Sequence, residues 1–121
     1  MYRLRVVQDF AAAHQLDGYE GACEALHGHN WKVEVEVEGQ TLSDVGILID
    51  FKQLKQIIMA ELNQLDHRFL NDLPAFQDHN PSSEHLSRYI YSQLKPKLPA
   101  GIVLACVRTW ESDNACAEYY E

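Results

Sequence analysis

Three histidines near the start of the chain, His14, His27 and His29, have the spacing of metal ligands. Side chains at positions i and i+2 of an extended strand point to the same side, and Gly28 between the last two leaves room for both rings. His14 has the same even-numbered parity as the mostly apolar residues before it, so its ring is expected on a covered face. A single histidine on such a face is more often a hydrogen-bonded core residue. If the two stretches form a hairpin, however, all three rings converge near its end, and three neutral imidazoles suit zinc with one coordination position open.

Cys23 lies four residues before His27, and this Cys-x3-His-x-His pattern has two interpretations. In the structural interpretation Cys23 is a fourth ligand, and the zinc site is closed. In the catalytic interpretation Cys23 stays off the metal, and its thiolate acts as a base or nucleophile beside the open position. The spacing alone leaves both open.

Three more residues are candidates for roles in the same site. Asp66 and His67 are adjacent, and a carboxylate can fix the tautomer of a histidine and raise its basicity. The simpler interpretation is a histidine that interacts with the end of a helix. Glu111 follows the last strong predicted strand and could accept two hydrogen bonds from an amidine-like group. The simpler interpretation of Glu111 is a solvated turn residue.

The hydrophobic pattern predicts the elements that position these residues. Alternation predicts strands over residues 2–14, about 31–38, 102–110 and 115–119. In the second strand Glu34, Glu36 and Glu38 alternate with apolar residues and are expected to face water. One helix should follow an N-cap at Asp50, and a second should open near residues 80–82, with Pro81 in its first turn, and stop at Pro96.

The resulting order of strand, strand, helix, helix, strand, strand indicates an α+β fold. A four-stranded antiparallel sheet with both helices packed on one face is the expected architecture. Four strands leave two open edges, which association with further copies can cover, so we expect a homo-oligomer.

Size and composition narrow the function further. A chain of 121 residues is expected to form a single domain over 1–121. The net charge of −8 argues against nucleic acid or a membrane surface as a partner. No apolar run is long enough to span a bilayer, and the first ten residues do not resemble a signal peptide, so a cytoplasmic protein is expected. Three cysteines fit a reducing compartment, in which Cys106 and Cys116 are expected to be small, buried, inert thiols rather than a disulfide.

Taken together, the motifs resemble the 6-pyruvoyl-tetrahydropterin synthase family over nearly the whole chain. The matching residues are, in order, His14, Cys23-x3-His27-Gly28-His29-Asn30, Ile47-Leu48-Ile49-Asp50-Phe51-x2-Leu54-Lys55, Leu65-Asp66-His67-x2-Leu70-Asn71, Asn80-Pro81-Ser82-Ser83-Glu84 and Trp110-Glu111. Ser82 stands where threonine is commoner and keeps the hydroxyl. The short gap between Cys23 and His27 resembles the bacterial branch that forms 6-carboxy-5,6,7,8-tetrahydropterin in the queuosine and 7-deazapurine pathway. The pyruvoyl-forming branch is the alternative, and a non-catalytic zinc-binding relative is a further one.

The resemblance implies a fold, a reaction and roles for these residues. The fold would be the tunnelling fold, in which sheets of neighbouring subunits join into a barrel, trimers stack into hexamers, and active sites lie between subunits. His14, His27 and His29 would bind catalytic zinc, and 7,8-dihydroneopterin triphosphate would be the substrate. Cys23 would abstract a proton with help from Asp66 and His67, and Glu111 would hold the pterin ring edge. The products would be 6-carboxy-5,6,7,8-tetrahydropterin, acetaldehyde and triphosphate.

Overall fold

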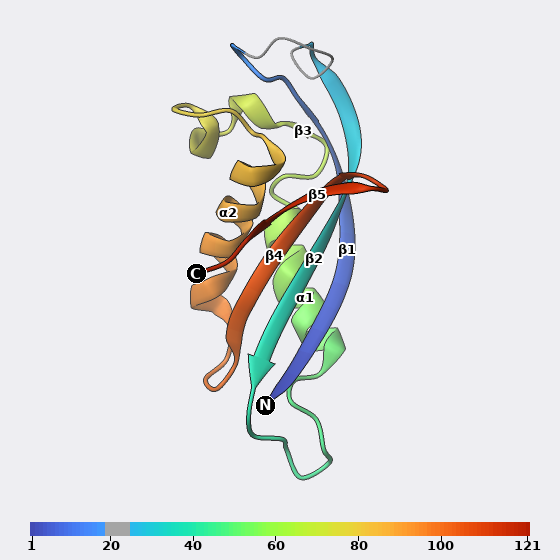
Figure 1. The fold of residues 1–121 in the computed structure, drawn as a ribbon, viewed down its shortest axis with the longest axis vertical. Coiled ribbons are helices and arrows are strands. Elements are labelled where there is room, and N and C mark those ends of the chain that lie inside the picture. Colours follow the sequence, from blue (N-terminus) through green and yellow to red (C-terminus); the bar gives the residue numbers. More distant parts are fainter. Residues whose placement is uncertain (19–24) are drawn as a thin grey trace.

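Two long strands, β1 (Tyr2–His14) and β2 (His27–Gly39), pair along their whole length as an antiparallel hairpin. The structure is a computed structural model that describes residues 1–18 and 25–121. In Figure 1 the end of the hairpin that carries residues 14 and 27 extends beyond both helices. The alternation that predicted β2 begins at Trp31, but the strand itself starts at His27. Because pairing continues to this residue, His14 lies directly opposite His27.

Three more strands complete the sheet. β4 (Val103–Ser112) pairs antiparallel with β2, and β5 (Ala115–Tyr119) pairs antiparallel with β4. A fifth strand, β3 (Arg68–Phe69), pairs parallel with β1 at the opposite edge, and the spatial order is β3-β1-β2-β4-β5. The prediction of four strands was therefore one short, because two residues are too few to show an alternating pattern.

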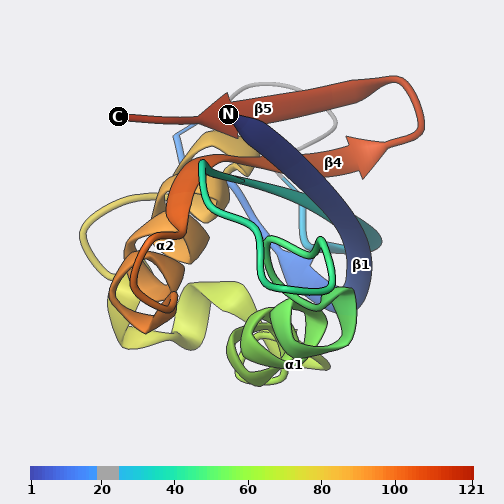
Figure 2. The ribbon, with the colours of Figure 1, turned by 90° about the horizontal axis from the view of Figure 1, so that it is seen from below.

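Two helices lie on one face of this sheet, as Figure 2 shows. α1 (Phe51–Leu62) packs on β1 and begins after Asp50, whose side chain accepts a hydrogen bond of 2.8 Å from the Lys52 amide. α2 (Ser83–Leu94) packs on β4 and β5 and has Ser82 as its N-cap. Pro81 thus precedes the helix instead of standing in its first turn, since the serine hydroxyl takes the capping position. Among the described residues, no helix is long and apolar enough to cross a bilayer.

Short 3-10 helices connect the larger elements. They are η1 (Leu70–Asp72), η2 (Pro74–Phe76) and η3 (Lys95–Lys97). The sequence pattern did not predict them. Pro96 lies within η3, immediately after α2, where it prevents the α-helix from continuing.

The core lies between the helices and the sheet. The side chains of Trp31, Val33, Val35 and Val37 in β2 are fully buried against Leu54, Ile58, Leu62, Leu86, Ile90 and Leu94 of the helices. This is the α+β architecture that the sequence predicted, with both helices on one side.

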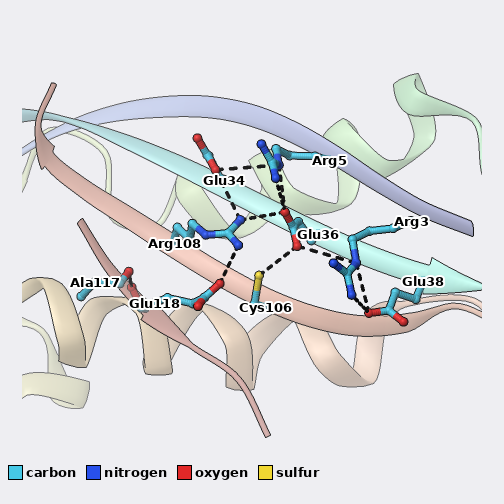
Figure 3. A network of polar contacts seen from close by, with 10 residues as sticks. Arg3, Arg5, Glu34, Glu36, Glu38, Cys106, Arg108, Ala117 and Glu118 are labelled. Atoms are coloured by element: carbon cyan, nitrogen blue, oxygen red, sulfur yellow. Dashed lines mark hydrogen bonds and ion pairs between the residues drawn. The ribbon is translucent and has the colours of Figure 1, made fainter. Parts of the chain in front are cut away.

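The opposite face of the sheet carries a network of charged side chains (Figure 3). Glu36 lies at its centre, with its Oε1 atom 2.7 Å from Arg5 Nη2 and 2.8 Å from Arg108 Nη1. Only 3% of the Glu36 side chain is exposed. The prediction that Glu36 faces water was wrong, because the two guanidinium groups cover it. Burial raises its pKa, but the hydrogen bonds from Arg108 and Arg5 outweigh burial and lower the pKa to about 2.

The two cysteines of β4 and β5 are free thiols. Cys106 is buried and donates to Glu36, whereas Cys116 is exposed opposite Trp110, contrary to the expectation that both are buried. Burial, followed by hydrogen bonds to Glu118 and Glu36, raises the pKa of Cys106 to about 12. Cys106 is therefore an inert thiol, as expected.

Candidate metal centre

The structure brings His14, His27 and His29 together at the end of the β1–β2 hairpin. His14 pairs with His27 and Ala12 with His29, so all three rings lie on the helix-facing side of adjacent strand positions. Their ring centroids are 4.4 to 5.2 Å apart. The Nε2 atoms of His14 and His27 are separated by 3.1 Å. Strand parity alone, applied to a hairpin, leads to this arrangement.

Backbone carbonyls fix the orientation of two of the rings. His14 Nδ1 lies 2.8 Å from the Pro81 carbonyl oxygen, and His27 Nδ1 lies 2.6 Å from the Ala25 carbonyl oxygen. A carbonyl only accepts, so each Nδ1 must donate its hydrogen, and in the neutral ring each Nε2 then presents a lone pair. Two lone pairs facing each other across 3.1 Å repel, and a cation between them removes the repulsion. The donor set therefore fits a metal ion bound through Nε2 atoms.

Glu111 supplies a carboxylate to the same cluster. Its Oε1 atom lies 3.3 Å from the Nε2 of His14, 3.8 Å from that of His27 and 2.9 Å from that of His29. The four side chains form a group that could hold a metal ion. Ser83, in the first turn of α2, donates a hydrogen bond of 3.4 Å to the second carboxylate oxygen.

The sequence pattern predicted that Glu111 follows the strand, but in the structure Glu111 belongs to β4. Trp110 pairs with Cys116 and Ser112 with Ala115, so Glu111 is the extra residue of a β-bulge between β4 and β5. Glu111 has the same parity as Val107 and Thr109, whose side chains are buried on the helix-facing side of β4. Its carboxylate therefore faces the same side of the sheet as the three histidine rings.

The cluster sits in a half-buried environment. The His14 side chain is 1% exposed, while those of His27, His29 and Glu111 are about one quarter exposed, which leaves an approach from solvent. Trp31 forms one wall, and its ring centroid lies 4.9 Å from that of His14 and 5.1 Å from that of His29. Burial lowers the pKa of His29, an effect larger than the opposing influence of Glu111, and this shift favours the neutral ring that a metal ligand requires. Its Nε2 makes no hydrogen bond of good geometry within the described part of the chain.

Asp66 and His67 lie outside this four-residue group. They form a pair of their own, with His67 Nδ1 2.9 Å from Asp66 Oδ2. The Ala11 amide donates to the other Asp66 oxygen, and this bond, together with His67, lowers the pKa of Asp66. His67 has a left-handed backbone, with φ of 57°, and its side chain is 82% exposed. The pair thus presents a histidine, oriented by a carboxylate, to the surroundings of the molecule.

Cys23 belongs to residues 19–24, which lie outside the described residues, so its predicted role stays a prediction. Sequence reasoning missed the residues that orient the ligands: Ala25 and Pro81 through their carbonyl groups, and Ser83 through its hydroxyl. A backbone carbonyl carries no signal of residue type, so nothing in the sequence pointed to Ala25. The Asn80-Pro81-Ser82-Ser83 motif was the available signal for Pro81 and Ser83.

Comparison with known proteins identifies the family. The family model for 6-pyruvoyl tetrahydropterin synthase matches residues 3–121. The chain belongs to this family. The match covers nearly the whole chain and confirms the family resemblance that the sequence showed.

Individual relatives within the family carry different names. A 6-carboxy-5,6,7,8-tetrahydropterin synthase from Synechocystis sp. is 34% identical over 92% of this chain and 87% of the relative. A dihydroneopterin monophosphate aldolase from Pyrococcus furiosus is 34% identical over 87% of this chain and 85% of the relative. The solved structure of 6-pyruvoyl tetrahydropterin synthase from Caenorhabditis elegans superposes with a TM-score of 0.86 at 26% identity, over 99% of this chain and 95% of that one. Family membership therefore establishes the fold and identifies the chain as a member of a family of pterin enzymes. The exact reaction has to be inferred from the site.

Proposed function

We propose that this protein is a zinc-dependent lyase that converts 7,8-dihydroneopterin triphosphate into 6-carboxy-5,6,7,8-tetrahydropterin, releasing acetaldehyde and triphosphate. The observation that carries the proposal is the convergence of His14, His27 and His29, with the Nδ1 atoms of two rings already committed to carbonyl oxygens. The similarity to the Synechocystis relative, which bears the name of this activity, supports the carboxy-forming branch. The product would serve queuosine and 7-deazapurine biosynthesis.

Zinc is the metal that this donor set suits best. Three imidazole nitrogens with one position left for substrate or water is a donor set typical of catalytic zinc. When bound, zinc supplies Lewis acidity that makes substrate hydroxyls and the adjacent C–H bonds more acidic. His14 is buried and rigidly oriented, whereas the partly exposed His27 and His29 line the approach for substrate.

Glu111 is proposed to hold the pterin. A carboxylate can accept two parallel hydrogen bonds from the 2-amino group and ring N–H of a pterin, as it does from a guanidinium. Its position between the histidines and Ser83 supports this role, because a pterin bound there would have its reacting side chain beside the metal site.

Proton transfer is assigned to Cys23, assisted by the pair of Asp66 and His67. Asp66 orients the His67 ring through Nδ1, which leaves Nε2 to exchange a proton. The exposure of His67, which is not one of the four clustered residues, supports an active site completed between subunits. The sheet supports the same conclusion, because among the described residues β5 forms one edge and most of β1 has a strand partner on one side only, so further copies can pair there.

Product identification tests the proposal. Zinc-loaded protein is incubated with 7,8-dihydroneopterin triphosphate, and the products are identified by mass. We expect 6-carboxy-5,6,7,8-tetrahydropterin and acetaldehyde. Formation of the 6-pyruvoyl product, or turnover of dihydroneopterin monophosphate in its place, would assign a different reaction of the family. No turnover by correctly loaded protein would contradict the enzyme proposal altogether.

A further inference from the structure

Two asparagine side chains hold the chain that leads away from His14. Asn71, in η1, accepts a hydrogen bond of 2.9 Å from the Gln15 amide and donates one of 2.8 Å to the Gln15 carbonyl. Asn80, just before α2, makes the same pair with Asp17, at 3.0 and 2.9 Å. We call these two side chains, with the backbone groups that they bind, the amide clamp.

The amide clamp replaces strand pairing where pairing ends. The β1–β2 ladder stops at His14 and His27, and β3 pairs only with Ala12 and Ala13. Residues 15–17 therefore have no strand neighbour in the described sheet. A carboxamide carries the same donor and acceptor as a backbone amide, so each asparagine satisfies one residue as a further strand would.

The clamp is directly connected to the metal site through residues 80 and 81. The Asn80 side chain binds Asp17, and the next residue, Pro81, accepts the hydrogen bond from His14 Nδ1. The Asn80 carbonyl also accepts a hydrogen bond of 2.6 Å from His85 of α2, which fixes this segment to the helix. The same short segment thus holds the His14 ring from one side and the chain after His14 from the other.

We infer that Asn71 and Asn80 are positioning residues of the metal centre, which maintain the geometry of its ligands. This role rests on the proposed metal site. They keep residues 15–17 in place, so that the His14 ring stays under the Pro81 carbonyl with its Nε2 toward the other two histidines. Without the clamp, the end of β1 can move relative to α2, and the three nitrogens lose their common centre. Substitution of outer groups that orient metal ligands typically lowers metal affinity or activity about 10–100-fold.

The test uses the variants Asn71→Ala and Asn80→Ala in the full chain, with Gln77→Ala as the matched control. Gln77 also donates through a carboxamide, to the carbonyls of Asn71 and Leu73, but it does not bind residues 15–17. Two quantities are measured: amide hydrogen exchange of Gln15 and Asp17, and zinc affinity by competition with a chelator. Both can be read without any turnover, so they remain informative if the proposed reaction is wrong.

We expect exchange to accelerate about 2–10-fold at Gln15 in Asn71→Ala and at Asp17 in Asn80→Ala, as loss of one hydrogen bond predicts. Zinc affinity should fall about 10–100-fold in both variants and stay unchanged in Gln77→Ala. Asn80→Asp keeps the acceptor for the Asp17 amide, so this amide should stay protected and zinc affinity should be intermediate. The same variant tests the inference if an alanine variant does not fold. Unchanged zinc affinity, or acceleration spread over the core strands, would show a purely structural role and overturn the inference.

Discussion

The Nε2 atoms of His14 and His27 lie 3.1 Å apart, while the Nδ1 atom of each ring faces a backbone carbonyl oxygen. Both rings therefore have their lone pairs directed at the same point in their neutral forms. Such an arrangement is stable when a cation occupies that point, and it is costly when nothing does. The preorganised tautomers, more than the mere presence of three histidines, are what make this a metal site.

Replacing any one of these rings should abolish tight zinc binding. We expect His14→Ala, His27→Ala and His29→Ala each to weaken zinc affinity by more than the roughly 10–100-fold that outer groups contribute. Titration with a chelating indicator measures the change. His79→Ala is the control, since His79 contacts Phe76 and His85 and is not part of the cluster, and it should bind zinc like the wild type. Retention of full affinity in His29→Ala would refute this ligand set.

Glu111→Gln should affect the substrate more than the metal. Three imidazoles remain to hold zinc, but the neutral amide cannot accept two hydrogen bonds from the pterin edge. We expect kcat/KM to fall about 10–100-fold, the loss of hydrogen bonds to a charged acceptor, with zinc still bound. Steady-state kinetics of the zinc-loaded variants measures it, and Ser83→Ala, which removes only the 3.4 Å contact to Glu111, should have a smaller effect. An unchanged kcat/KM in Glu111→Gln would exclude it from recognition.

His67→Asn should separate proton transfer from metal binding. His67 has a φ of 57°, and asparagine tolerates this left-handed conformation, so the turn after α1 should persist. We expect kcat to fall about 10²–10⁴-fold, the usual contribution of a positioned acid or base, while zinc affinity is unchanged. Turnover and zinc titration on the same preparation measure both. An active His67→Asn variant would leave His67 as a surface residue at the end of a helix.

Much of this arrangement followed from local sequence patterns. The parity of His14, His27 and His29 was sufficient to place three rings on one face, because the period of a strand is two. The N-cap at Asp50 was predictable for the same reason, since capping depends on a few consecutive residues.

What failed depended on contacts distant in sequence. Glu36 is buried by Arg5 and Arg108 from two other strands, which no pattern within β2 reveals. β3 forms only because residues 68–69 dock beside β1, and Glu111 reaches the histidines because β4 pairs beside β2. Each of these features is set by the register between strands.

The charged face should make stability depend on pH through Glu36 (Figure 3). Its folded pKa of about 2 is below the ordinary value of 4.5, so its stabilisation is present above pH 4.5 and is lost as the pH falls from 4.5 through 2. Glu36→Gln should lower the free energy of unfolding by about 1–3 kcal/mol at pH 7, because two guanidiniums lose a buried charged acceptor. The difference from wild type should shrink between pH 4.5 and 2.

Urea denaturation at fixed protein concentration measures this prediction. Glu38→Gln is the control, because the Glu38 contact with Arg3 is solvent-exposed and exposed pairs contribute about 0–1 kcal/mol. A difference between Glu36→Gln and wild type that is as large at pH 2 as at pH 7 would show that the carboxylate charge is not its source.

X-ray absorption at the zinc edge, recorded on the wild-type protein without substrate, tests the central claim most directly. An open catalytic site held by His14, His27 and His29 predicts three imidazole ligands at about 2.0–2.1 Å with oxygen completing the shell and no sulfur. A sulfur ligand at about 2.3 Å would mean that Cys23 closes the site. That result would contradict the catalytic account and make the zinc structural.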